Sequence, residues 1–221
     1  MRRVNIGLTQ RMLIVNDKGA IGIGTLIIFI AMIMVAGIAA SVIIQTMNTL
    51  EQKALDTGTQ TLRDVSSGLR VSHVNGYFNG TTISQLAIFI RTIAGSDEID
   101  LTNTFIRLSD TNNEVILNYT SNVFNDGVTN GLFGTANSSL LTSTTYGLMV
   151  VTDIDGSCIS TSPIINEDDM VVLLVNSTQC FSGISPRTKV FGNVVPQYGI
   201  SGVISFTTPS TYIHTIIELQ P

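Results

Sequence analysis

Residues 20–44 read AIGIGTLIIFIAMIMVAGIAASVII, an almost wholly apolar run. Thirteen of these 25 residues are Ile, Leu, Val or Phe, and no charged residue occurs between Gly19 and Leu50. At about 1.5 Å per residue, a helix of this length measures roughly 37 Å, which exceeds the hydrocarbon core of a bilayer at about 30 Å. The sequence therefore predicts one N-terminal apolar helix that is able to cross a membrane.

The segment before this run, residues 1–19, is basic and ends in Asp17-Lys18-Gly19. A secretory signal has an apolar core of about 7–15 residues and is cut beyond it. Here the apolar run is longer, and the conspicuous small residue, Gly19, precedes it. We therefore expect a cut between Gly19 and Ala20 that removes residues 1–19 as a signal peptide; the alternatives are an uncleaved anchor and a conventional cut beyond the run. Positive charges hold such a leader in the cytoplasm, so the rest of the chain should face outward.

Charge is sparse in this chain of 221 residues, at 12% Asp, Glu, Lys and Arg. Without the leader, the chain has 7 basic and 15 acidic residues and a net charge of −8. A negative chain is a poor ligand for nucleic acid or for anionic lipid. The composition therefore predicts no nucleic-acid partner, and it suits a head that stays soluble outside the cell.

The helical pattern continues beyond the apolar run but becomes amphipathic. The next apolar residues form a narrow stripe among charged residues: Leu50, Leu55, Leu62, Val65 and Leu69. Such a stripe is typical of a helix with one apolar neighbour. We expect one long hydrophobic helix over residues 20–72, followed by an extracellular head domain at residues 73–221.

From Asn75 onward the sequence changes to short runs rich in β-branched and aromatic residues, separated by Gly, Asn, Asp, Ser or Pro. The eight runs are Ile83–Ile93, Thr104–Leu108, Glu114–Tyr119, Tyr146–Thr152, Met170–Val175, Val190–Val195, Gly199–Thr207 and Tyr212–Leu219. No helical pattern separates them, which predicts antiparallel strands. The expected fold class is therefore α+β: a long N-terminal hydrophobic α-helix followed by an antiparallel β-sandwich or barrel, with Asn122–Thr145 as a long exposed loop.

Small residues gather in one part of the apolar helix. Ala36 and Ala40 are four residues apart, as are Gly37 and Ser41, so the members of each pair share a helix face. Such pairs let helix backbones approach closely where lipid and protein are equally apolar. We expect these four residues to mediate helix–helix assembly; the alternative is an ordinary membrane anchor.

No set of residues resembles a catalytic site, so we do not expect an enzyme. His73 and His214 have no matching acid or nucleophile motif and are interpreted as structural. No cofactor is required, although three acidic groups could offer oxygen ligands to a structural Ca²⁺. These groups are Asp97-Glu98-x-Asp100, Asp153-x-Asp155-Gly156 and Glu167-Asp168-Asp169. None has the EF-hand spacing, and Asp153 and Asp155 are the better metal candidates.

The outward-facing part contains two cysteines, Cys158 and Cys180. An oxidising exterior permits a disulfide between them, and two buried free thiols are the alternative. We expect the disulfide.

Four Asn-x-Ser/Thr sequons mark candidate N-glycosylation sites at Asn79, Asn118, Asn137 and Asn176. Asn79 and Asn137 are the stronger candidates because they fall in predicted loops, whereas Asn118 and Asn176 end predicted strands.

With these features in place, the chain resembles the archaeal flagellins, or archaellins, the major subunits of the archaellum filament, nearly end to end. Lys18-Gly19 followed by residues 20–27 resembles the class III signal peptide and processing site of that family. The matching head segments are Ala94–Ser96, Ile99–Leu101, Pro186–Val190, Val194–Pro196, Gly202–Ser210 and Glu218–Gln220. Two departures are Gln197, where an acid often follows the proline, and the cysteine pair.

The resemblance implies an immunoglobulin-like β-sandwich head and helices that bundle into the core of a swimming filament. It also implies a prepilin-type signal peptidase, an ATP-driven membrane platform that assembles and rotates the filament, and self-assembly of the chain alone or with paralogous archaellins. The precursor is then expected in the cytoplasmic membrane with its head outside, and the mature chain in the extracellular filament. The alternatives are an archaeal type IV-like adhesion pilin and a membrane-anchored surface domain that binds sugar or metal.

Overall fold

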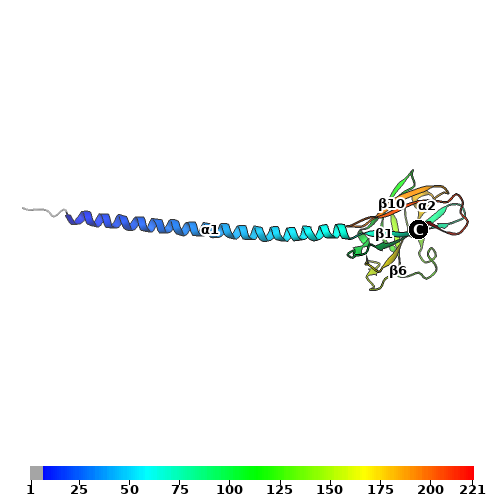
Figure 1. The fold of residues 1–221 in the computed structure, drawn as a ribbon, viewed down its shortest axis with the longest axis horizontal. Helices are drawn as coiled ribbons and strands as arrows, with labels where there is room; N and C mark the ends of the chain where they lie inside the picture. The colour runs from blue at the N-terminus through cyan, green and yellow to red at the C-terminus, as the bar shows by residue number, and fades with distance from the viewer. Residues whose placement is uncertain (1–6) are drawn as a thin grey trace, which may run out of the picture. The chain divides into compact units, whose positions relative to one another are not determined.

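The computed structural model describes the backbone of residues 7–221. It describes the exposure of Gly19 and the side chains of residues 21–221. The chain divides into two compact units, Met1–Gly58 and Thr59–Pro221. Figure 1 labels the long helix α1, which includes all of the described first unit, and several strands of the head.

Helix α1 spans Gly7–Ser66, so the predicted long apolar helix is confirmed within the described residues. Its end differs from the expected position near residue 72. Ser67 is fully buried, its carbonyl accepts a hydrogen bond from the Ile200 N–H at 2.9 Å, and the Gly68 carbonyl accepts one from the Ile93 N–H at 3.0 Å. Leu69, which we assigned to the helical stripe, instead begins the first strand and enters the core of the head. The helix ends because these backbone groups bond to the head.

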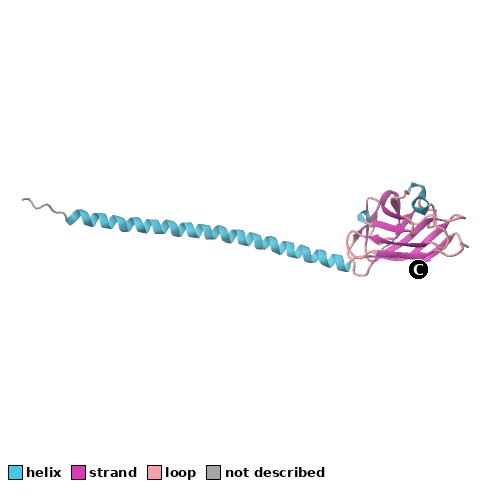
Figure 2. Ribbon diagram, turned by 90° about the horizontal axis from the view of Figure 1, so that it is seen from above, coloured by secondary structure: helices cyan, strands magenta, loops and turns pink. Residues whose placement is uncertain are grey.

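Twelve strands and one short helix make up most of the head. Their bounds are β1 Leu69–Phe78, β2 Ile83–Thr92, β3 Ile99–Asp100, β4 Phe105–Ser109, β5 Glu114–Asn125, β6 Thr145–Thr152, β7 Cys158–Ile159, β8 Ser162–Ile165, β9 Met170–Val175, α2 Ser177–Phe181, β10 Lys189–Val195, β11 Gly202–Thr207 and β12 Ile216–Gln220, with 3-10 turns at Leu101–Asn103 and Ser138–Leu140. Figure 2 shows the strands in layers within the head.

Nine of the strands form one hydrogen-bonded sheet in the order β11-β10-β4-β5-β6-β9-β2-β1-β12, and β3, β8 and β7 form a small second sheet. Neighbours in the large sheet are antiparallel except β5 and β6, which are parallel. The two edge strands meet through one side chain: the Gln220 Oε1 accepts from the Ser205 N–H at 2.8 Å, and its Nε2 donates to the Val203 carbonyl at 3.3 Å. The largely antiparallel β head is thus confirmed, as a sheet that nearly closes on itself.

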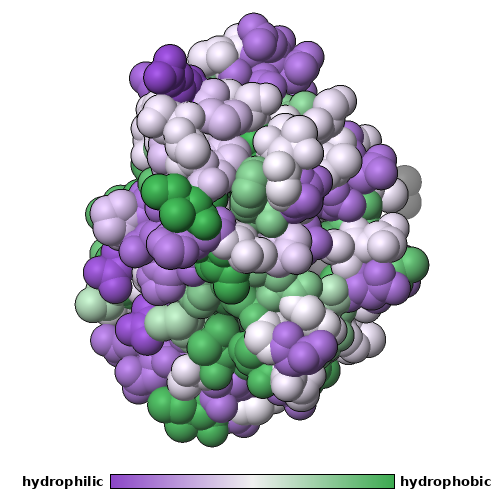
Figure 3. Space-filling view, turned by 90° about the vertical axis from the view of Figure 1, so that its right-hand side faces the viewer, coloured by the Kyte–Doolittle hydropathy of each residue, from purple (hydrophilic) through white to green (hydrophobic). Residues whose placement is uncertain are grey.

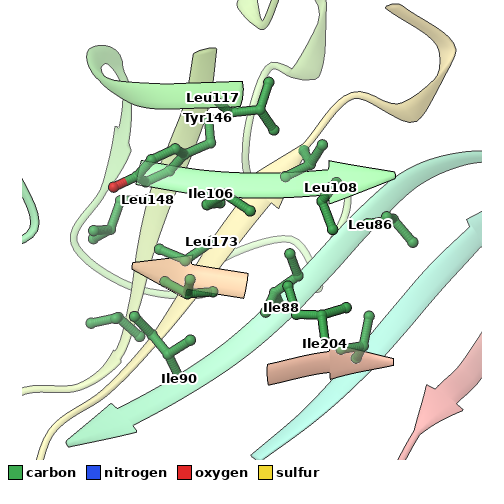
Figure 4. Close-up of a cluster of buried hydrophobic side chains, with 14 of the residues drawn as sticks. Leu86, Ile88, Ile90, Ile106, Leu108, Leu117, Tyr146, Leu148, Leu173 and Ile204 are labelled. Atoms are coloured by element: carbon green, nitrogen blue, oxygen red, sulfur yellow. The ribbon is translucent and has the colours of Figure 1, made fainter. Parts of the chain in front are cut away.

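Alternation along the strands explains the core. In β11, Ile204 and Phe206 are buried, while the alternate residues Val203 and Ser205 point away from the core, as the period of two in a strand requires. Figure 4 shows such inward-facing residues from several strands meeting in one cluster, with Tyr146 among them. The Tyr146 hydroxyl lies 3.1 and 3.0 Å from the carbonyl oxygens of Leu101 and Thr104, so this large buried residue keeps hydrogen-bond acceptors.

The segment that we expected to be a long exposed loop, Asn122–Thr145, is in fact partly strand and partly packed. Strand β5 continues to Asn125. The remaining loop lays Leu132, Phe133 and the buried Leu141 against a second hydrophobic cluster on the sheet. Composition misled the prediction because many polar residues surround these few apolar ones.

Candidate functional site

The first functional feature is the apolar surface of α1. From Ile21 to Ser66 the helix is long and apolar enough to cross a membrane, and none of its most apolar window is buried inside the chain. Apolar side chains lie exposed on every side of the helix, so a single neighbouring element could not cover its apolar surface. A helix of this kind is stable only when lipid or other protein chains surround it. By contrast, Figure 3 shows a face of the head where hydrophilic and hydrophobic residues are interspersed.

The small residues Ala36, Gly37, Ala40 and Ser41 all lie exposed on this helix. A Cβ atom added to Gly37 would meet no other atom within 4 Å. The chain itself therefore does not require a glycine there. Assembly through these residues remains a proposal, and close approach of another helix would explain their small size.

The expected cleavage site lies at the edge of what the structure describes. Gly19 is exposed and within α1. The Ala20 side chain, and residues 1–6 of the signal peptide, lie outside the described residues. The cut between Gly19 and Ala20 therefore stays a prediction.

The second feature is an acidic cluster in the head. Oxygen atoms of Asp153, Asp155 and Asp169 all lie within 4.8 Å of one another. The first two residues were the predicted metal candidates, and Asp169 belongs to a separate acidic group that the fold brings to them. Asp169 is fully buried, and its carboxylate accepts hydrogen bonds from the N–H groups of Asn166 at 2.9 Å and Ile154 at 3.4 Å. The sequence marked Asp169 as part of an acidic group that could offer ligands to Ca²⁺, but it did not place that group beside Asp153 and Asp155.

The three carboxyl groups differ in their electrostatic environment. Burial, together with the charges of Asp153 and Asp155, raises the pKa of Asp169. Hydrogen bonds from the hydroxyl and the backbone N–H of Ser157 lower the pKa of Asp155. Carboxylate oxygens are the ligands that Ca²⁺ prefers, and a bound cation would offset the repulsion among the three groups.

We expect calcium to stabilise the head through this cluster. Because the pKa of Asp169 is raised in the folded state, its carboxyl group stabilises the fold most when it is protonated, below its unfolded pKa of about 3.9. This contribution is lost as the pH rises through the pKa of the folded state. Near neutral pH, Ca²⁺ at 100 times its Kd should add about 2.7 kcal/mol and raise the unfolding midpoint by about 5–10 °C. Calorimetry of the detergent-solubilised chain with Ca²⁺ or chelator would measure the shift.

The control for the calcium experiment is Asp168→Asn, which removes an adjacent exposed charge outside the cluster. It should keep the calcium response, whereas Asp153→Asn should lose it. Equal midpoints with Ca²⁺ and chelator in the unmodified chain would show that the cluster holds no calcium.

The predicted disulfide between Cys158 and Cys180 is wrong for this structure, because both thiols are free. Cys158 lies in β7, and its N–H donates to Asp153 in the acidic cluster that precedes β9. Cys180 lies in α2, which follows the other end of β9. Six residues of strand separate these ends, roughly 20 Å, whereas a disulfide needs Cβ atoms about 3.5–4.5 Å apart. Cys158 instead lies in the hydrophobic core, and the half-buried Cys180 packs against that core.

The two thiols should be unreactive in the folded protein. Burial raises the pKa of Cys158 to about 12 and that of Cys180 to about 11. Only the thiolate is nucleophilic, and at pH 8 roughly 0.01–0.1% of each thiol is ionised. We expect no iodoacetamide labelling of native filaments at pH 8, and two labels per chain in denaturant without reductant, measured by intact mass. An absence of label in denaturant would instead indicate a disulfide.

The four sequons differ in accessibility. Asn79, Asn118 and Asn137 are exposed. Asn176 is half-buried, and its Nδ2, the atom that would carry a glycan, donates to the Ser138 carbonyl at 3.0 Å. The structure therefore favours the first three as acceptors, including Asn118, which points outward from β5.

Comparisons with known proteins agree on one family. The model of the archaeal-type flagellins matches residues 19–206. Flagellin B2 of Methanocaldococcus jannaschii is 44% identical over 211 residues, which cover 93% of this chain and 96% of that protein. Flagellin B4 of Pyrococcus abyssi is 42% identical over 218 residues, covering 93% and 100% of the two chains.

Solved structures show the same likeness. The crystal structure of archaeal flagellin FlaB1 from Methanocaldococcus jannaschii has a TM-score of 0.64 at 36% identity and covers 70% of this chain and 97% of its own. A structure of the archaeal flagellum of Methanospirillum hungatei strain JF1 has a TM-score of 0.63 at 14% identity, covering 90% and 99%. At that identity the second likeness concerns the fold alone.

An uncovered apolar helix joined to a β head defines the class of structural subunits that assemble through a helix. The family match and the two relatives make the assignment specific. The chain belongs to the archaeal-type flagellin family and is an archaellin, a filament subunit of the archaeal flagellum. It is thus a structural protein of an extracellular appendage, which sets aside the adhesion pilin and the anchored binding domain.

Proposed function

We propose that the mature chain, residues 20–221, polymerises through α1 into the core of the filament and that the heads form its outer surface. The observation that carries this proposal is the helix from Ile21 to Ser66, whose apolar window is wholly uncovered in the single chain. Copies of the same helix can cover it on all sides. The role of the resulting filament is swimming motility.

Removal of the leader allows the helix to leave the membrane and enter the filament. The cationic residues of the leader hold the precursor in the cytoplasmic membrane with its head outside. Once they are gone, the helix keeps its apolar surface but no longer has a charged anchor on the cytoplasmic side. A head-to-tail contact that does not close into a ring then gives an open helical polymer. The family match that begins at Gly19 agrees with this division of the chain.

The partners follow from this route. They are further copies of the chain or paralogous archaellins, a prepilin-type signal peptidase that recognises Gly19 and Ala20, and a membrane platform that assembles and rotates the filament. We also propose glycans at Asn79, Asn118 and Asn137, whose exposed positions leave room for them.

The N-terminal residue of protein sheared from cells as filaments tests the proposal directly. Ala20 at the N-terminus of a chain in rotating filaments is the expected result. Filament protein that begins at Met1 or near Ala40 would contradict the cut. Filaments that never rotate would contradict the role in swimming, and recovery of the protein only with membranes would contradict polymerisation.

A further inference from the structure

Two arginines face each other at one end of the β1–β2 pair. Arg70 is the second residue of β1 and is directly paired with Arg91 near the end of β2. Directly opposite residues of antiparallel strands have Cβ atoms about 4.5–5.5 Å apart. Both arginines line a cavity of about 370 Å³. The other residues that line it are Thr92, Ile93, Ala94, Glu167 and Asp168.

This arrangement has an electrostatic cost that no ion pair among the described side chains relieves. Like charges that lie directly opposite each other on adjacent strands repel. The Nε of Arg91 is buried and has no hydrogen-bond partner. Among the residues whose side chains are described, neither arginine forms an ion pair, although Glu167 and Asp168 line the same cavity. A buried donor without an acceptor points to a group that the single chain lacks.

We infer that Arg70 and Arg91 bind a carboxylate from a second copy of the chain in the filament. The inference rests on the proposed function, because it requires copies to pack along their helices. A carboxylate between two guanidinium groups accepts hydrogen bonds from both and separates the like charges.

Glu51 of α1 is the carboxylate that fits this role best. The other acidic residues in the amphipathic half of the helix already have partners: Asp64 accepts a hydrogen bond from Gln60, and Asp56 interacts within its own chain. Glu51 is exposed and forms no hydrogen bond or ion pair with any residue described. Arg70 follows the end of α1 by only four residues, so the arginine pair belongs to the helix-proximal end of the head.

Charge exchange tests the contact. Arg91→Glu should reduce filament yield more than tenfold, because it replaces a half-buried cation that faces a carboxylate by a second anion. Adding Glu51→Arg to that variant should restore the yield. The matched control is Arg107→Gln, which removes a head cation whose exposed ion pair with Glu114 has little energetic weight; its yield should stay near normal. Yield is measured as sheared filament protein per cell.

Cross-linking identifies the donor without depending on yield. Filaments of a chain with Glu51→Cys and Arg91→Cys, treated with a short bismaleimide, should give a ladder of oligomers on a denaturing gel. The pair Glu51→Cys and Arg107→Cys should give none. The native thiols do not compete, because Cys158 is buried, Cys180 is partly buried, and burial raises the pKa of both thiols.

Three results would overturn the inference. Normal filament yield with Arg91→Glu would show that no carboxylate is bound there. A lack of rescue together with a lack of cross-linked ladder would exclude Glu51. If sulfate raises the unfolding midpoint of the detergent-solubilised wild-type chain but not of Arg91→Gln, while Arg91→Gln filaments dissociate normally, a free oxyanion occupies the cavity instead. None of these results concerns Ala20 or rotation of unmodified filaments, so failure here is distinguishable from failure of the proposed function.

Discussion

Cells that carry Gly37→Leu should make short filaments or none, although they insert and process the precursor normally. A Cβ at this position meets nothing within the chain, so the substitution should not disturb the subunit itself. In a bundle, the larger side chain pushes neighbouring helices apart, and overpacking typically costs about 1–3 kcal/mol. Every subunit incurs that cost. Filament length in electron micrographs and the dissociation temperature of sheared filaments measure the effect.

Two further variants serve as comparisons for Gly37→Leu. Gly37→Ala adds a single methyl group and should have a smaller effect in the same direction. Asn130→Ala changes an exposed residue of the head and should leave assembly near normal. Leader removal, followed by the size of the chain on a gel, should be complete in all three variants, since Leu is more apolar than Gly and favours insertion. Full-length, equally heat-stable Gly37→Leu filaments would mean that the heads, not the helices, supply the cohesion.

The second large effect is expected from Gly19→Val. A branched side chain at the residue before the cut should block removal of the leader, so that the precursor stays in the membrane and the cells lack filaments. The leader would then keep Arg2, Arg3, Arg11 and Lys18 on the cytoplasmic side and hold the helix in the bilayer. Immunoblots of membrane and sheared fractions measure both outcomes.

The matched control for this variant is Gly22→Val, which places the same side chain three residues beyond the bond, at an exposed helix position where a Cβ meets nothing. Its leader should be removed. Filaments of Gly19→Val that begin at Ala20 would show that the peptidase does not read this glycine.

Periodicity predicted much of the fold because the relevant signals are local. The uncharged apolar run of 25 residues predicts a helix by its length, and all eight predicted strand runs overlap strands of the structure. The end of the helix was harder to predict, since Leu69 continues the helical stripe. Only the bonds from Ser67 and Gly68 to distant loops assign it to β1.

The candidate functional residues likewise include some that local sequence predicts and others that only the fold brings together. The small-residue group of α1 is visible in sequence because helix geometry places residues four apart on one face. Asp169 was predicted only as part of a separate acidic group, because its proximity to Asp153 depends on how β6 and β9 pair. The disulfide prediction failed for a related reason: a spacing in sequence says nothing about the two ends of β9. Arg70 and Arg91 also became a pair only through strand register.

The bridge that Gln220 forms between β11 and β12 has a consequence for crowding on the filament surface. Strand edges that face solvent template further pairing and can fuse neighbouring chains. Here a side-chain amide occupies backbone groups of β11 as a strand would. In the proposed filament, neighbouring heads would then contact each other through side chains, because these backbone groups of β11 are not free to pair with a strand of the next head. The heads can therefore tilt against one another as the proposed filament bends, without forming a cross-β array.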